Sequence, residues 1–101
     1  MSGIVLDRTE LHTKLKRFKE QRADEYHLKL LGYFGSYARN QAGDDSDVGI
    51  VFDTDAPNLF RAVVMKQELE QLLGRPVDML QLRGLSNAGL KARIENEAIY
   101  V

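Results

Sequence analysis

Two apolar runs separated by a short polar segment constrain the fold of this chain more than any other feature. The first run, residues 28–34, is followed directly by Gly35-Ser36. Ten further residues separate Ser36 from Asp47, which directly precedes the second run, residues 48–52. Apolar runs of this length, bounded by turn residues, are typical of buried β-strands. The pattern therefore predicts two neighbouring strands, with a glycine-containing turn after the first and a carboxylate at the start of the second.

Capping residues and the helical spacing of apolar side chains predict the other elements. In chain order we expect a helix over residues 8–24 that Asp7 caps, a short helix within 36–40, a helix from Pro57 to Gly74, a strand over 77–82, a helix that Ser86 caps and an edge strand over 98–101. Three or four strands in a small mixed sheet, with the helices packed to one side, make a two-layer α+β (α/β) fold. Residues 1–101 are expected to form a single domain.

Composition argues against several classes of protein. The chain contains no cysteine, which excludes disulfides and thiolate metal sites. A net charge of −1 argues against a dedicated nucleic-acid-binding protein, which usually carries a clear basic excess. No stretch approaches a membrane span, which needs roughly 18 apolar residues, and the N-terminus lacks the pattern of a signal peptide. We therefore expect a cytoplasmic protein with no membrane contact.

Gly35 and Ser36 have the chemistry of a phosphate-binding turn. Gly35 has no Cβ, so its backbone can approach a polyphosphate closely. Ser36 supplies a hydroxyl, and backbone N–H groups at the start of a helix favour anions. A glycine-serine pair is also common in ordinary tight turns, so these two residues indicate phosphate binding only together with others.

Asp47 and Asp78 are those other residues. Each lies on or beside a predicted strand among apolar residues, where a carboxylate is costly unless it reaches water, a cation or a hydrogen-bond donor. Carboxylates at alternate positions of a strand share a face and can hold two Mg²⁺ ions for phosphoryl transfer, and a third carboxylate can help to deprotonate the nucleophile. Either Asp alone also fits a strand-end residue that reaches water. The whole set, in this order, indicates metal-assisted phosphoryl chemistry.

The segments Gly35-Ser36-Tyr37-Ala38-Arg39, Ser46-Asp47 and Val77-Asp78-Met79 resemble the motifs of the minimal nucleotidyltransferase family, which includes the MntA-like antitoxins of the DNA polymerase β-like superfamily. The similarity extends to the tail, residues 90–100. The resemblance implies the nucleotidyltransferase fold, with ATP as nucleotide donor and Mg²⁺ as cofactor. It also implies the site residues: Gly35, Ser36 and Arg39 for the nucleotide, and Asp47 and Asp78 for catalysis and the metal. Arg39 fits a surface ion pair nearly as well.

The resemblance also implies a partner. In the best-understood members an antitoxin acts beside a helical HEPN-type ribonuclease toxin and transfers AMP to one of its tyrosines. The expected partners of this chain are therefore a HEPN-type toxin and a nucleoside triphosphate, with no membrane and no dedicated nucleic-acid binding.

The sequence departs from the family pattern at Gly49, where the second carboxylate of the family's DxD motif falls. Asp53 shares the strand face but lies about 13 Å from position 49, too far to replace that carboxylate. Asp45 and Asp47 would form a DxD pair that lies two residues earlier in the chain than the family's pair. Three functions therefore remain open: a transferase that adenylylates its toxin, a catalytically degenerate module that binds nucleotide or partner, and a free-standing nucleotide sensor.

Overall fold

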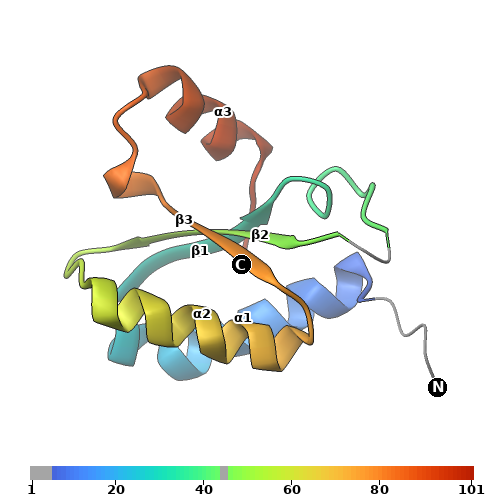
Figure 1. Cartoon of the computed structure of the whole chain (residues 1–101), viewed down its shortest axis with the longest axis horizontal. Helices are drawn as coiled ribbons and strands as arrows, with labels where there is room; N and C mark the ends of the chain where they lie inside the picture. The colour runs from blue at the N-terminus through green and yellow to red at the C-terminus, as the bar shows by residue number, and fades with distance from the viewer. Residues whose placement is uncertain (1–5, 44–45) are drawn as a thin grey trace.

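A computed structural model describes residues 6–43 and 46–101 (Figure 1). In chain order the elements are α1 (Arg8–Tyr26), β1 (Leu28–Phe34), β2 (Val48–Thr54), α2 (Leu59–Leu73), β3 (Val77–Gln81), the short 3₁₀ helix η1 (Leu82–Gly84), α3 (Ala88–Glu97) and β4 (Ile99–Tyr100). The expected α+β class is confirmed. Within the described residues, none of these helices is long and apolar enough to cross a membrane.

The four strands form one mixed sheet in the order β3-β2-β1-β4. β1 runs antiparallel to β2 and to β4, whereas β2 and β3 are parallel. The chain end was expected to supply an edge strand, and β4 is that strand. With these directions, the end of β1 and the starts of β2 and β3 meet at one end of the sheet.

The helix boundaries follow the capping residues. The Asp7 carboxylate accepts a hydrogen bond from Glu10 N at 2.7 Å, as expected for the first helix. Gly74 ends α2 in the left-handed conformation, with φ 68°, which is the usual role of glycine after a helix. The expected cap at Ser86 was wrong. Asn87 directly precedes the first helical residue, and its side-chain oxygen accepts from Leu90 N at 3.0 Å.

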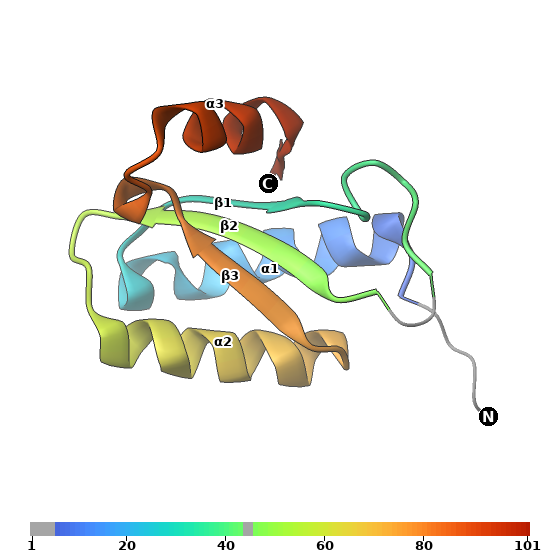
Figure 2. The ribbon, with the colours of Figure 1, turned by 45° about the horizontal axis from the view of Figure 1, so that its top comes forward.

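α1 and α2 lie against one face of the sheet and α3 against the other (Figure 2). The larger hydrophobic cluster joins α1 and α2 to strand residues such as Ile50. The smaller cluster contains Val51, Leu82 and Ile94. All helices were expected on one side, and this was wrong for α3. Because β2 is apolar at successive positions, both of its faces need to be covered.

Residues 35–40, directly after β1, form turns and no helix, contrary to the expectation for residues 36–40. Gly35 O accepts from Arg39 N at 3.1 Å, whereas Ser36 O accepts from Gln41 N at 2.7 Å. The spacing of these hydrogen bonds changes from one to the next, so they form consecutive turns. Asn40 adopts a left-handed φ of 57°, a conformation that ends helical propagation.

Candidate functional site

Strand register brings Asp78 beside Gly49. In the parallel pair of β2 and β3, Val48 lies opposite Val77 and Gly49 lies opposite Asp78. On the other side of β2, Phe34 at the end of β1 pairs with Gly49. Neighbouring strands are about 4.8 Å apart, so the Gly35 turn and the starts of β2 and β3 form one continuous surface.

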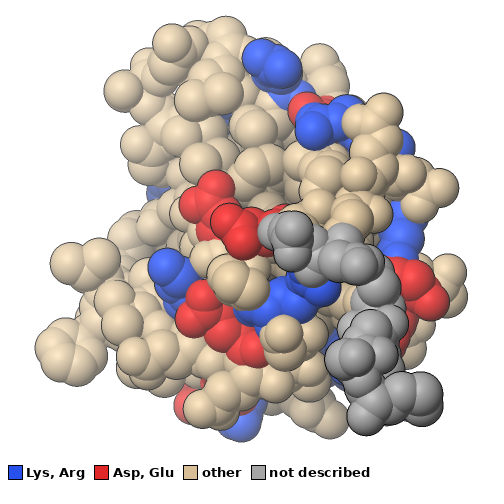
Figure 3. Space-filling model, turned by 45° about the vertical axis from the view of Figure 1, so that its right-hand side comes forward, with Lys and Arg blue, Asp and Glu red and all other residues tan. Residues whose placement is uncertain are grey.

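Asp47 and Asp78 both reach solvent at this end of the sheet. Each is exposed, and Asp47 immediately precedes β2. Val77 and Met79 pack in the cluster with α1 and α2, so the alternation of side chains along β3 places Asp78 on the opposite face, which α3 covers in part. Figure 3 brings this side of the molecule forward and shows acidic side chains grouped near its middle, with basic side chains next to them.

The turn at Gly35 and Ser36, the candidate phosphate turn, has the backbone conformation that its glycine predicts. Gly35 has φ 77°, a left-handed value that favours glycine, and nothing lies within 4 Å of the position where a Cβ would project. Tyr37 anchors the turn, because its side chain is buried in the core. Burial raises the pKa of the Tyr37 hydroxyl, and the charge of Arg75 opposes part of that rise.

Arg39 and the turn are both bonded to Glu97, the last residue of α3. Gly35 N donates to Glu97 Oε1 at 3.2 Å, and Arg39 Nη1 donates to the same oxygen at 2.5 Å. Arg39 Nε also donates to Gln41 Oε1 at 3.2 Å. Of the two interpretations left open for Arg39, the structure contains the ion pair. Glu97 was not among the predicted site residues, because its contact with the turn joins distant parts of the chain and no local motif signals it.

Phe34 covers the position of the missing second carboxylate. A Cβ built on Gly49 would lie 2.9 Å from Phe34 O and 3.0 Å from its ring atom Cε2. Real Cβ atoms almost never approach other atoms this closely. The site therefore presents an aromatic ring over Gly49, where the family pattern has a second acidic side chain.

The donor set at this site fits a metal ion that arrives with a nucleotide. Within residues 6–43 and 46–101, no group of three acidic, histidine or cysteine side chains can hold a metal. Mg²⁺ is commonly held by one or two carboxylates, with waters and substrate phosphates completing its six positions. Asp47 and Asp78 can supply two such ligands. Asp45, the member of the shifted pair, lies outside the described residues.

Asp53 is engaged elsewhere, in agreement with its exclusion from the site. Arg83 donates from Nε to Asp53 Oδ1 at 3.1 Å and from Nη2 to Oδ2 at 3.0 Å. This bidentate pair joins the far end of β2 to η1 and leaves Asp53 without a role near Asp47.

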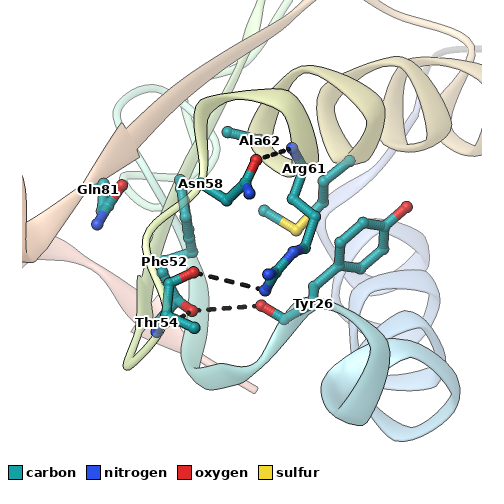
Figure 4. A pocket seen from close by; sticks show the side chains of 9 residues that line it. Tyr26, Phe52, Thr54, Asn58, Arg61, Ala62 and Gln81 are labelled. Atoms are coloured by element: carbon teal, nitrogen blue, oxygen red, sulfur yellow. Dashed lines mark hydrogen bonds between the residues drawn. The ribbon is translucent and has the colours of Figure 1, made fainter.

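A small crevice at the far end of β2 is structural in character (Figure 4). Arg61 reaches across it and donates from Nη1 to Ala56 O at 3.5 Å, while Thr54 Oγ1 donates to Tyr26 O at 3.3 Å. Its volume of about 10 Å³ is that of roughly one water molecule. It is too small for a nucleotide and lies at the opposite end of β2 from Asp47.

Comparison with known proteins gives a consistent result. The family described as Nucleotidyltransferase domain matches residues 15–101. The protein adenylyltransferase MntA of Thermococcus cleftensis is 32% identical over 102 residues and covers the whole of both chains. A solved structure of a candidate minimal nucleotidyltransferase superposes with a TM-score of 0.81, at 28% identity over 96% of this chain and 98% of that one. A crystal structure of a toxin-antitoxin with AMP-PNP has the same fold, with a TM-score of 0.70 at 19% identity over 84% and 70% of the two chains.

Proposed function

The chain belongs to the nucleotidyltransferase domain family, and from this premise we propose that it is the antitoxin of a toxin-antitoxin pair. Its partner in this proposal is a HEPN-type ribonuclease toxin, which it neutralises with the help of Mg²⁺ and ATP. The name of the Thermococcus cleftensis relative, a protein adenylyltransferase, supports a protein as acceptor. The related fold of a toxin-antitoxin with AMP-PNP supports both a toxin partner and an adenine nucleotide.

The observation that carries the proposal is the meeting of the Gly35 turn with the starts of β2 and β3. In this arrangement Gly35 and Ser36 hold the triphosphate by backbone N–H groups and a hydroxyl, and Arg39 adds a positive charge. Asp47 and Asp78 hold Mg²⁺, which neutralises charge that develops on the phosphate oxygens.

The reaction proposed is transfer of AMP to a hydroxyl of the toxin. The hydroxyl oxygen forms a bond to the α-phosphorus of ATP, the bond from that phosphorus to the pyrophosphate oxygen breaks, and the hydroxyl proton moves to a nearby base. Asp78 is the candidate base, because it is exposed at the start of β3 and a carboxylate can accept this proton.

A second candidate function is neutralisation by binding alone, and Gly49 favours it. A two-metal clamp normally uses a carboxylate that bridges both ions. Here Phe34 lies over that position. A nucleotide held by the remaining groups would then stabilise the complex with the toxin and would not react.

One experiment separates the two functions. The chain is incubated with the product of the adjacent gene, Mg²⁺ and ATP labelled at its α-phosphate, and both the label on the partner and the partner's ribonuclease activity are measured. Label together with loss of ribonuclease activity supports transfer, and Asp47→Asn is then expected to abolish both effects. Loss of ribonuclease activity without label on the partner supports neutralisation by binding. In that case Asp47→Asn should still inhibit the ribonuclease. A partner that remains unlabelled and fully active contradicts the antitoxin proposal.

A further inference from the structure

We propose that the Glu97 carboxylate occupies the anion position of the phosphate turn and has to leave it before a triphosphate binds. The inference rests on the function proposed above, because it concerns the same turn. One oxygen of Glu97 accepts from both Gly35 N, at 3.2 Å, and Arg39 Nη1, at 2.5 Å. These are two of the donors that the proposed function assigns to phosphate.

A carboxylate and a phosphate compete for such donors. Both are anionic oxygen acceptors that form charge-assisted hydrogen bonds to backbone N–H groups and guanidinium groups. The single N–H of Gly35 cannot serve both at full strength, and two anions at this distance repel each other. Binding of Glu97 and binding of a triphosphate to the turn are therefore mutually exclusive.

The strand pairing of β4 holds Glu97 in this place. Glu97 lies two residues before Ile99, which pairs with Tyr33 near the end of β1, while Tyr100 pairs with Gly32. A Cβ at Gly32 would lie 2.5 Å from Ile99 O, so glycine permits this close pairing of the two strands. The Glu97 side chain is only 20% exposed, compared with 50% for Arg39. The contact is therefore part of the fold of the C-terminal segment.

The exchange requires only a small change in the protein. Rotation of the Glu97 side chain away from the turn frees both Gly35 N and Arg39. The phosphate then replaces the Glu97 carboxylate as the anionic partner of Arg39. The apparent affinity for a triphosphate equals the intrinsic affinity multiplied by the fraction of molecules in which Glu97 has left the turn. Removing the Glu97 charge is expected to raise that affinity about fivefold.

Calorimetric titration of Glu97→Gln tests the proposal with two probes, Mg–AMP-PNP and inorganic tripolyphosphate. The substitution keeps the size of the side chain and removes its charge. Glu95→Gln is the matched control, because it makes the same change of charge on the same helix at an exposed position. Tighter binding of both probes to Glu97→Gln, with Glu95→Gln equal to the wild type, supports the proposal.

Other outcomes overturn the proposal or separate it from the proposed function. Unchanged or weaker binding by Glu97→Gln, an equal gain in Glu95→Gln, or no binding of either probe to any variant overturns it. If the affinities are unchanged but the partner is still adenylylated, the inference fails and the proposed function stands. If Glu97→Gln binds tripolyphosphate more tightly but the partner is neither labelled nor inhibited, the inference stands and the proposed function fails.

A measurement on the wild type covers the case in which Glu97→Gln does not fold. Addition of tripolyphosphate should shift the NMR signals of the Gly35 amide and the Glu97 side-chain carboxyl together. A Gly35 signal that moves while the Glu97 carboxyl signal stays fixed overturns the proposal.

Discussion

Phe34 and Gly49 face each other across the pair of β1 and β2, and the Phe34 ring lies where a side chain at position 49 would project. A side chain there has to displace the ring or the strand. We expect Gly49→Asp to lower the free energy of unfolding by about 1–3 kcal/mol. Since the new carboxylate joins Asp47 and Asp78, Mg²⁺-dependent affinity for ATP should rise at least about tenfold. Calorimetry with and without Mg²⁺ and chemical denaturation measure the two effects.

Gly49→Asn is the matched control for Gly49→Asp, because the asparagine side chain has nearly the same size as aspartate and carries no charge. It should lose the same stability and gain no metal-dependent affinity. An unchanged affinity in Gly49→Asp, combined with loss of binding in Asp45→Ala, would assign the metal to the shifted pair of Asp45 and Asp47 instead.

At the scale of elements, α1 and α2 are joined through Glu68, which accepts from the Tyr26 hydroxyl and pairs with Arg22. Burial, with help from the hydrogen bond to Glu68, raises the pKa of Tyr26 to about 12 from an ordinary value of 10.0. The native state therefore keeps this proton at a pH where the unfolded chain loses it. The resulting stabilisation is complete below pH 10 and is lost as the pH rises through about 12.

Tyr26→Phe should remove this part of the pH dependence. The free energy of unfolding by urea is measured for both proteins from about pH 9 to pH 12. The advantage of the wild type should shrink across this range by roughly 1–3 kcal/mol. The other tyrosines are present in both proteins, so their titration cancels. A difference that stays constant with pH would show that Tyr26 does not keep its proton in the native state beyond pH 10.

The elements themselves could largely be predicted from the sequence, because their signals are local. The apolar run of β1, the Asp7 cap and the stop at Gly74 are each contained in a few neighbouring residues. The position of α3 could not be predicted in the same way. It depends on which face of the sheet still lacks cover once α1 and α2 are packed, and that is a property of the assembled fold.

The candidate site likewise contains some features that local sequence predicts and others that depend on the assembled fold. Local motifs point to Gly35, Asp47 and Asp78, and strand order places them at one end of the sheet. The contact of Glu97 with the turn joins residues 62 positions apart and depends on the register of a two-residue strand. The ring of Phe34 over Gly49 likewise follows from pairing between strands. No local pattern contains either contact.

At the scale of the whole molecule, the surface carries an apolar group at the start of α2. Leu59 is 83% exposed and Phe60 is 85% exposed, and Val63 and Val64 beside them are about half exposed. Less apolar surface is exposed near the Gly35 turn and on α3. The exposed apolar side chains on that side, Leu90 and Tyr100, are 41% and 37% exposed.

If the proposed toxin binds where most apolar surface is exposed, it contacts the start of α2. Because exposed apolar groups of this kind mark interaction sites, Leu59→Ser combined with Phe60→Ser should weaken binding of the toxin by at least about 2 kcal/mol. The same change should alter the free energy of unfolding by only about 0.5 kcal/mol, since neither side chain is packed. Binding is measured by calorimetry with the product of the adjacent gene, and Leu90→Ser on α3 is the matched control. Weaker binding in Leu90→Ser alone would place the interface beside the phosphate turn and remove α2 from it.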